Sequence, residues 1–189
     1  FKVISVGGTN GKGSTIAFVD SVYAQSEHNV GRFTSPHLIN YNERFAVNGN
    51  IVTDTQIIGA FEKIEAIRGE PSLTYFEFST LAALQIFADT EIDIAILEVG
   101  LGGRLDSVNV VDNDICVITN IAIDHTDYLG DTRELIGREK AGIMRANKIC
   151  ICGDENPPNT LMDYAKTINA LLEFVDQPYF GKIGLEGEH

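Results

Sequence analysis

The fold of this chain is decided near its start, by the stretch Val6-Gly7-Gly8-Thr9-Asn10-Gly11-Lys12-Gly13-Ser14. Residues 3–6 form an apolar run that predicts a buried strand, and residues 15–19 predict a helix. Glycines let the backbone turn its N–H groups toward one point, a helix N-terminus favours an anion, and a lysine adds a full positive charge. The stretch therefore predicts a binding site for a nucleotide phosphate.

The stretch departs from the strict Walker A pattern at two positions. Val6 stands where that pattern has its first glycine, and Gly13 stands where it has a serine or threonine, so the hydroxyl arrives one residue later, at Ser14. A tight strand-to-helix turn could need these glycines for packing alone. That alternative leaves Lys12 unexplained, because a charge in such a turn needs a partner.

The composition predicts a globular domain with a sizeable core, since 44% of the 189 residues are hydrophobic and 22% are charged. The net charge of −13 argues against a nucleic-acid partner, because phosphate backbones need clustered lysine and arginine. No apolar run approaches the roughly 18 residues that span a bilayer, so we expect no membrane partner. Three cysteines in strand-like runs predict reduced thiols, core packing and a cytoplasmic protein: Cys116, Cys150 and Cys152.

The hydrophobic pattern predicts an α/β fold, with a mostly parallel sheet flanked by helices as in P-loop NTPases. Residues 92–99 and 115–118 are continuous apolar strands, which are typical of a sheet covered on both faces. Further strands are expected at 1–8, 30–34, 148–152 and 171–175. Helices are expected at 14–26, from the capping box at 53–56 to Gly69, and at 77–89, 131–145 and 158–169.

Two further local patterns concern residues 41–69. Asn48-Gly49 lies between apolar alternations and predicts a hairpin. The helix that follows is expected to bury one apolar face, made of Ile57, Ile58, Phe61, Ile64 and Ile67. The helix at 77–89 is expected to bury a second set, made of Phe78, Leu81, Ala82, Leu84 and Phe87.

Polar side chains collect at the carboxyl ends of the predicted strands, where open α/β sheets bind their ligands. One strand leads into Ser35-Pro36-His37, a second ends in Glu98 before residues 100–106, and a third leads to Asp124-His125. Mg²⁺ takes oxygen ligands, usually one or two carboxylates together with substrate phosphates. The pattern predicts a Mg-nucleotide site in which Glu98 stands where a Walker B strand has its acidic residue.

Several of these residues also have a purely structural interpretation. Glu98 could cap a helix or pair with Arg104, and Ser35 could be a turn residue before Pro36. For His37 the structural interpretation, a hydrogen-bonded histidine, is favoured.

The interpretation is different for two residues farther along the chain. For His125 a functional role is favoured, because Asp124 and Asp127 flank it at a strand end. Lys140, taken alone, would be a solvated lysine on a helix. Its assignment therefore depends on its neighbours in the sequence.

Six motifs occur together in order, and they resemble the folylpolyglutamate synthase and dihydrofolate synthase family, relatives of the Mur ligases. They are residues 8–14 (GTNGKGS), 35–38 (SPHL), 73–77 (LTYFE), 97–106 (LEVGLGGRLD), 124–126 (DHT) and 137–143 (GREKAGI). The resemblance covers about residues 3–153. It implies the fold of a Mur ligase central domain and an ATP- and Mg²⁺-dependent acid–amino-acid ligase of folate biosynthesis and one-carbon metabolism. The γ-phosphate would pass to a carboxylate of folate or dihydropteroate, and the amino group of glutamate would then displace it.

The resemblance also implies roles for individual residues. The ATP phosphates would be held by Thr9, Asn10, Gly11, Lys12, Gly13 and Ser14. Ser35 and Glu98 resemble ligands of a first Mg²⁺, His125 resembles a ligand of a second, and Lys140 resembles the lysine that family members carbamylate. Lys12, His125 and Lys140 are thus the expected catalytic residues. Acceptor-binding residues are expected in three segments, at Pro36, His37, Thr74, Phe76, Glu77, Arg104 and Asp106.

The chain differs from the family in extent, because family members carry an N-terminal lead-in and a further C-terminal domain. Phe1 begins directly on the first strand. We therefore expect part of a longer protein, with an ATP-binding domain over 1–180, a tail over 181–189, a monomeric state and negligible ligase activity on its own.

Two alternative functions stay open. A Mur-type ligase that adds amino acids to a peptidoglycan precursor would fit the phosphate loop, His125 and Lys140, although Gly13 and the motifs at 35–38 and 73–77 favour the folate branch. A nucleotide-binding domain without ligase chemistry would bind ATP without depending on His125 or Lys140.

Overall fold

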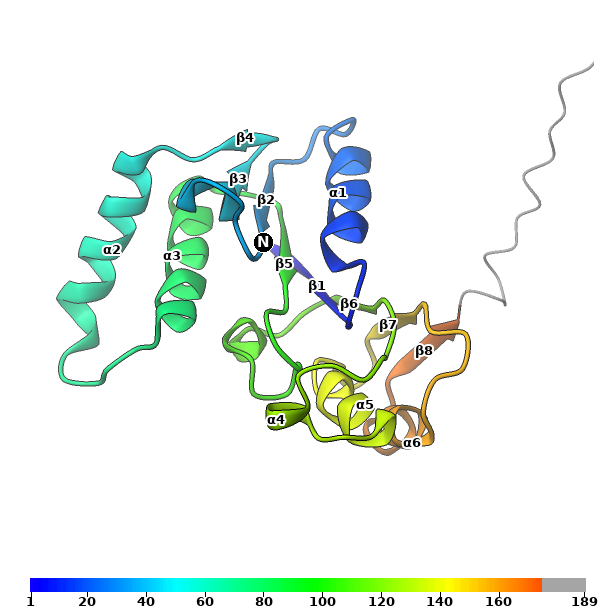
Figure 1. Cartoon of the computed structure of the whole chain (residues 1–189). Coiled ribbons are helices and arrows are strands. Elements are labelled where there is room, and N and C mark those ends of the chain that lie inside the picture. Colours follow the sequence, from blue (N-terminus) through cyan, green and yellow to red (C-terminus); the bar gives the residue numbers. More distant parts are fainter. Residues whose placement is uncertain (175–189) are drawn as a thin grey trace, which may run out of the picture.

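The structure is a computed structural model that describes residues 1–174. An eight-stranded sheet forms its centre (Figure 1). Six of its strands are parallel, and β3 and β4 extend one edge in antiparallel pairing. In spatial order the strands are β4 (Asn50–Ile51), β3 (Phe45–Val47), β2 (Val30–Phe33), β5 (Ile94–Glu98), β1 (Lys2–Gly7), β6 (Ile115–Ile118), β7 (Ile149–Cys152) and β8 (Leu171–Phe174). The predicted α/β class with a mostly parallel sheet is confirmed.

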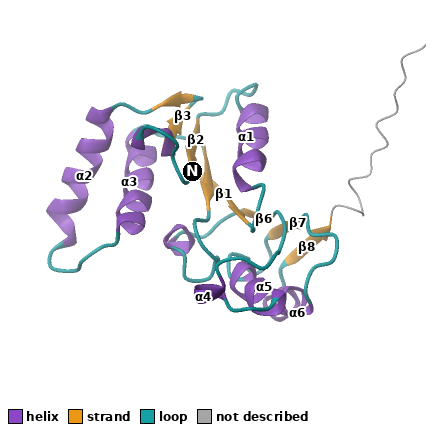
Figure 2. Cartoon of the chain, viewed as in Figure 1, coloured by secondary structure: helices purple, strands orange, loops and turns teal. Residues whose placement is uncertain are grey.

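Helices connect the parallel strands, as the colouring by secondary structure shows (Figure 2). The α-helices are α1 (Lys12–Tyr23), α2 (Asp54–Arg68), α3 (Tyr75–Asp89), α4 (Thr126–Leu129), α5 (Arg133–Ala141) and α6 (Asn159–Ile168). Two short 3-10 helices, η1 (Tyr41–Arg44) and η2 (Ser107–Val110), lie in the connections. None of the helices in this part of the chain has the length and apolar character needed to cross a membrane.

The core is divided between the two faces of the sheet because successive strand residues point to opposite sides. In β5, Ile94 and Ile96 pack with Ile16 of α1 on one face. Ala95 and Leu97 pack on the other face with side chains of α2 and α3. Farther along that second face, the cysteines of β6 and β7 are buried against α5 and α6, as predicted from their apolar surroundings.

The local sequence signals around the β3–β4 hairpin are confirmed. Asn48 and Gly49 have φ values of 50° and 74°, as a two-residue turn between twisted strands requires. Thr53 caps α2, since its side chain accepts the backbone N–H of Gln56 while the Gln56 side chain accepts that of Thr53.

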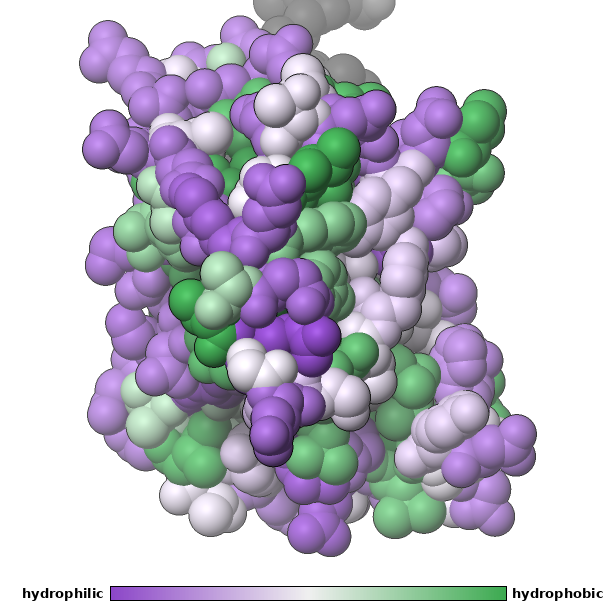
Figure 3. All heavy atoms as spheres, turned by 90° about the vertical axis from the view of Figure 1, so that its left-hand side faces the viewer, coloured by the Kyte–Doolittle hydropathy of each residue, from purple (hydrophilic) through white to green (hydrophobic). Residues whose placement is uncertain are grey.

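The predicted apolar face of α2 is partly wrong. Ile57 and Ile64 are buried, but Ile58 and Ile67 are 54% and 83% exposed. With 3.6 residues per turn, positions 57, 60 and 64 share the stripe that meets α3, and positions 58 and 67 turn away from it. On the face of the molecule that carries α2, hydrophobic and hydrophilic side chains are interspersed (Figure 3).

Some element boundaries also differ from those predicted. α1 begins at Lys12 rather than at residue 14, and α3 begins at Tyr75 rather than at residue 77. The helix expected over 131–145 is limited to α5, and the short helix α4 was not expected. In α3 the fully buried apolar side chains are Ala82, Ala83, Ile86 and Phe87, because Phe78, Leu81 and Leu84 are only half-buried. The expected tail at 181–189 lies outside the described residues.

Adjacent isoleucines of α2 provide a matched test of this packing. Ile57→Ala should lower the free energy of unfolding by about 2–4 kcal/mol, because it removes a buried side chain and leaves a cavity. Ile58→Ala should change it by about 0.5 kcal/mol or less, since that side chain is half exposed. Urea denaturation of both variants measures the difference, and equal effects would contradict the orientation of α2.

Candidate functional site

The phosphate loop, residues 7–13, joins the end of β1 to the first turn of α1 and is held in place by the segment that follows β6. Thr9 N–H donates to the carbonyl of Asn120 at 3.0 Å, and Asn10 N–H donates to Oδ1 of the same residue at 2.8 Å. Ala122 N–H donates to Oγ1 of Thr9 at 3.1 Å. These bonds fix the loop before any ligand binds.

Gly8 is the position where the loop and its support come closest. Its φ is +138°, and a Cβ built there would lie 1.8 Å from Oγ1 of Thr119. The Thr119 hydroxyl lies 2.7 Å from the carbonyl oxygen of Asn10, to which it donates. A glycine is therefore required at this position for two reasons, its backbone conformation and the close approach.

The N-terminus of α1 is open toward the loop. Gly11 is the N-cap, with φ 80°, and no side chain caps the helix. Apart from the chain neighbours and the backbone of α1 itself, no atom of the described residues lies within 4 Å of a Cβ built on Gly11 or Gly13. Nζ of Lys12 lies 3.2 Å from the carbonyl oxygens of Gly8 and Thr9, so the ammonium folds back over the loop. Free N–H groups, a helix dipole and a lysine together fit an anionic phosphate.

Glu98, the last residue of β5, is a buried carboxylate beside this loop. Its Oε2 accepts the backbone N–H of Ser35 at 2.9 Å, while Oε1 accepts no hydrogen bond from the described residues. Burial raises the pKa of Glu98 above its ordinary value, and the Ser35 N–H and the charge of Lys12 oppose that rise. The pairing with Arg104 considered from the sequence is not formed, because Arg104 contacts Glu139.

The three predicted catalytic residues line one small cavity of about 30 Å³, here called the phosphate-loop cavity. Lys12 comes from α1, His125 from the start of α4 and Lys140 from α5. Gly8, Thr9, Asp124 and Leu129 line the same cavity. Residues far apart in the sequence thus meet beside the predicted nucleotide site.

Lys140 is buried rather than solvated, with only 3% of its surface exposed. Burial, assisted by the positive charge of Lys12, lowers the pKa of Lys140 from 10.5 to about 8. A lysine in this environment is neutral more often than a surface lysine at the same pH. It can therefore react as an amine near neutral pH.

His125 lies at the start of α4 in a left-handed conformation, with φ 50°. Its side chain is 58% exposed, and Nε2 lies 3.7 Å from Oδ2 of Asp124. In residues 1–174 no group of three or more His, Cys, Asp or Glu side chains is gathered closely enough to hold a metal ion. The predicted ligand Glu98 is close to Ser35, while His125 belongs to the phosphate-loop cavity.

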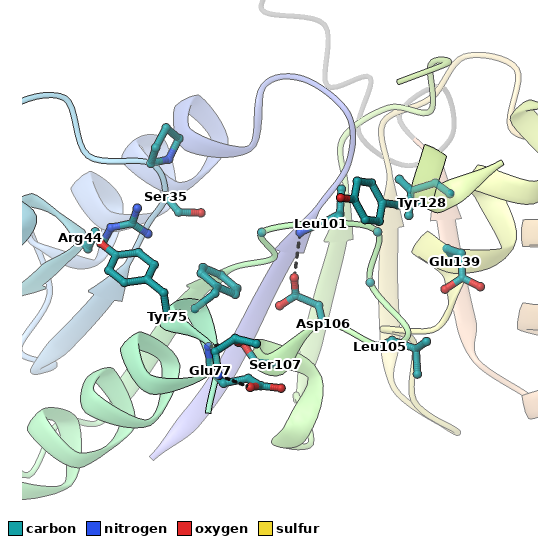
Figure 4. A pocket seen from close by; sticks show the side chains of 17 residues that line it. Ser35, Arg44, Tyr75, Glu77, Leu101, Leu105, Asp106, Ser107, Tyr128 and Glu139 are labelled. Atoms are coloured by element: carbon teal, nitrogen blue, oxygen red, sulfur yellow. Dashed lines mark hydrogen bonds between the residues drawn. The ribbon is translucent and has the colours of Figure 1, made fainter. Parts of the chain in front are cut away.

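A larger cavity of about 610 Å³, here called the large cavity, opens beside the phosphate-loop cavity (Figure 4). It lies between the loop after β2, the start of α3, residues 100–107 and α4. Pro36 and Phe76, two predicted acceptor-binding residues, line it together with the aromatic rings of Tyr75 and Tyr128. Leu129 lines both cavities, so they share a wall.

Three other predicted acceptor-binding residues line the large cavity but are already bonded to the protein. Thr74 and Glu77 form the capping box of α3, with the Thr74 N–H 2.7 Å from Oε2 of Glu77. Asp106 accepts the N–H groups of Leu101 and Val108 at 2.8 and 2.9 Å. Figure 4 shows the Leu101 bond crossing the turn of that loop. These three polar side chains shape the wall of the cavity.

Two predicted acceptor-binding residues do not line the large cavity. Arg104 points toward α5, where its Nε and Nη2 donate to Oε1 of Glu139 at 3.1 and 3.0 Å. His37 accepts the Nε–H of Arg44 on its Nδ1 at 2.9 Å, which agrees with the hydrogen-bonded histidine favoured from the sequence.

Arg44 is a residue of the site that the sequence analysis missed. It is only 7% exposed, lines the large cavity, and lies over the rings of Tyr41 and Tyr75 at 5.8 and 5.3 Å. Its Nε donates to His37, while no hydrogen bond from its two terminal nitrogens is found in the described residues. In the sequence Arg44 stands between a turn and a strand, and that position does not indicate whether its side chain is buried.

The family model of the Mur ligase middle domain matches residues 6–174. The chain belongs to the Mur ligase middle-domain family. The dihydrofolate synthase/folylpolyglutamate synthase of Buchnera aphidicola subsp. Schizaphis graminum is 51% identical over 176 residues, which are 93% of this chain and 42% of that protein. The resemblance to this family that the six motifs indicated is confirmed.

Solved structures agree with the assignment to the Mur ligase middle-domain family. E. coli FolC in complex with DHPP and ADP is 48% identical, with a TM-score of 0.90 over 92% of this chain and 42% of that one. The bifunctional folylpolyglutamate synthase/dihydrofolate synthase of Yersinia pestis, complexed with AMPPNP and Mn ion, is 47% identical, with a TM-score of 0.88 over the same shares. This Mur ligase middle domain thus spans about two fifths of the length of these relatives.

The buried charge of Lys140 should make the stability of this Mur ligase middle domain depend on pH. Between about 8 and 10.5 the unfolded chain binds more protons than the folded chain, so the contribution of Lys140 to stability rises with pH over that window. Lys140→Met should be more stable than the parent at pH 7, and the gap should narrow at pH 9.5.

Urea denaturation at the two pH values measures this gap. Lys166→Met, which changes a 79% exposed lysine side chain on α6, is the matched control and should show no such narrowing. A constant gap for Lys140→Met would mean that Lys140 is not buried as a cation at pH 7.

Proposed function

We propose that this domain binds ATP within an enzyme that joins L-glutamate to a carboxylate of a folate or of dihydropteroate. One observation carries the proposal: Lys12, His125 and Lys140 line a single cavity between the phosphate loop and the large cavity. A phosphate donor on one side and a carboxylate acceptor on the other would meet there. The names of the relatives and the ligands of their structures support this assignment.

The chemistry requires an activated carboxylate, because a carboxylate is a poor electrophile. One of its oxygens would attack the γ-phosphorus of ATP, ADP would leave, and an acyl phosphate would form. The amine of glutamate would then attack the acyl carbon, lose a proton and release phosphate. Lys12 would stabilise the charge on the transferring phosphoryl group.

The nucleotide would sit on the open N-terminus of α1, contacting N–H groups of Gly11, Lys12, Gly13 and Ser14. Thr9 and Asn10, whose N–H groups donate to Asn120, would hold the shape of the loop around it. Mg²⁺ would neutralise phosphate charge and orient the γ-phosphate. The free oxygen of Glu98 and the neighbouring Ser35 fit one ion, and His125 could serve a second. Lys140 could be carbamylated by CO₂, which would replace its positive charge with a carboxylate-like oxygen ligand.

The large cavity is the proposed site for the aromatic body of the acceptor. Phe76, Tyr75 and Tyr128 offer ring faces, Pro36 adds apolar surface, and Arg44 brings a positive charge. Thr74, Glu77 and Asp106 would hold the shape of this site through their bonds to backbone N–H groups. His37 would contribute indirectly, by fixing the guanidinium of Arg44.

The relatives favour the folate branch over a peptidoglycan-precursor ligase, since each one compared is a dihydrofolate or folylpolyglutamate synthase or FolC. We further propose that the enzyme is a monomer of the cytoplasm that binds no nucleic acid. The net charge of −13 supports the last point, and the three reduced, buried cysteines support the cytoplasmic location.

Nucleotide binding can be tested by calorimetric titration of Mg-ATP into the chain. Lys12→Ala and Glu98→Gln should each weaken binding by about tenfold or more, which corresponds to about 1.4 kcal/mol. Lys166→Ala removes an exposed lysine on α6 and should leave the affinity unchanged. An unchanged affinity for Lys12→Ala would refute the assignment of the phosphate loop.

Acceptor class can be tested by thermal denaturation. Dihydropteroate at about 100 times its Kd should raise the melting temperature by roughly 5–10 °C, because such binding stabilises a domain of this size by about 2.7 kcal/mol. A UDP-sugar should give no shift. Tyr75→Ala should reduce the shift, whereas Ile58→Ala, on the exposed side of α2, should not. A shift with the UDP-sugar alone would favour the peptidoglycan branch.

A further inference from the structure

A third cavity of about 360 Å³, here called the arginine cavity, lies between α4, α5 and residue 104. Its lining consists of Arg104, Tyr128, Leu129, Leu135, Arg138 and Glu139. Of this lining, the resemblance implies a role only for Arg104, and it assigns none to Arg138. Its two arginines are notable in a chain whose net charge is −13.

Arg138 differs from the other arginines of residues 1–174. Each of those others has a side-chain partner: Arg32 with Asp20, Arg44 with His37, Arg68 with Glu65, Arg104 with Glu139, Arg133 with Asp154 and Arg145 with Asp112. In the same part of the chain, Arg138 makes no hydrogen bond or ion pair within 4.0 Å, even with Glu134 one turn earlier on α5. Its guanidinium is available to a ligand.

The electrostatic balance of the arginine cavity favours an anion. Glu139 is the only acidic residue in the lining, and its Oε1 already accepts two N–H groups of Arg104. Arg138 therefore leaves the cavity with one uncompensated positive charge. A guanidinium presents paired N–H donors that match the two oxygens of a carboxylate.

The arginine cavity is connected to the proposed reaction site. Leu129 lines the phosphate-loop cavity, the large cavity and the arginine cavity, and Tyr128 and Glu139 line the last two. Figure 4 shows Tyr128 and Glu139 from the large cavity, on the side away from Arg44. A substrate that occupies the large cavity can thus extend toward Arg138 while one carboxylate reaches Lys12 and Lys140.

We propose that Arg138 is a specificity-determining residue that binds an α-carboxylate of a folate acceptor, and that this carboxylate is not the one that reacts. This inference rests on the proposed function. Dihydropteroate has a single carboxylate, which must react. A folate ends in glutamate, so it carries a second carboxylate that needs a cation, and each further glutamate of a polyglutamate chain adds another. The arginine cavity would therefore distinguish folate acceptors from dihydropteroate.

The first measurement is equilibrium binding to this chain with Mg-ATP present. The affinity for tetrahydrofolate diglutamate is divided by the affinity for dihydropteroate. A loss of folded protein would weaken the binding of both acceptors equally, so it cancels in this ratio. Arg138→Gln should lower this ratio about tenfold, and Arg138→Lys, which keeps the charge but loses the paired donors, should give an intermediate value. Arg68→Gln, on the distant helix α2, removes one positive charge and should leave the ratio unchanged.

The second measurement follows catalysis in a chimera, in which residues 6–174 replace the matching segment of E. coli FolC. The kcat/KM for the folate, divided by that for dihydropteroate, should fall about tenfold in Arg138→Gln, mainly because KM for the folate rises. A ratio that stays constant in both measurements, because the two acceptors are affected equally or not at all, would overturn the role of Arg138. Absence of binding and of glutamate addition with both acceptors in the unsubstituted proteins would instead overturn the proposed function, and this inference with it.

Discussion

The contact between the phosphate loop and the segment after β6 is the constraint on which the site depends. β1 and β6 pair in parallel, with Gly7 opposite Ile118, so the two chains leave the sheet side by side. Only a glycine at position 8 can then pass Thr119, because a Cβ would collide with its hydroxyl. Asn120 fastens the loop through two hydrogen bonds. The segment that holds the phosphate loop continues along the chain to His125 at the start of α4. The same contacts therefore fix the proposed phosphate site and the residues of α4 relative to each other.

Features that depend on a few neighbouring residues could be predicted from the sequence. The glycine-rich loop, the turn at Asn48-Gly49 and the capping box at Thr53 each depend on backbone conformations that specific residue types favour within four positions. The parallel sheet followed from continuous apolar strands. The grouping of Lys12 and His125 was also accessible, because each follows a strand of one sheet and such residues meet at its carboxyl edge. Lys140, near the end of α5, was placed with them only by the resemblance of the motif at 137–143.

Features that depend on contacts between distant segments could not be predicted in this way. The sequence around Arg44 shows a charge at the start of a strand, but the side chain is buried, and its guanidinium lies over the ring of Tyr75, which belongs to another helix. Arg104 lies in a motif that indicated substrate binding, yet its partner is Glu139, 35 residues later. The exposure of Ile58 depends on where α3 lies. In each case the decisive information is the identity of a neighbour in space.

Burial acts on the charges of the site in one direction. It raises the pKa values of Glu98 and Asp106 and lowers that of Lys140, so each group is pushed toward its neutral form. Keeping these buried groups ionised costs free energy unless a ligand brings charges that compensate them. A cation beside Glu98 and phosphates beside Lys12 would supply them, and they would favour the ionised carboxylate and screen the two lysines from each other. The site is therefore better suited electrostatically to a metal–nucleotide pair than to either partner alone.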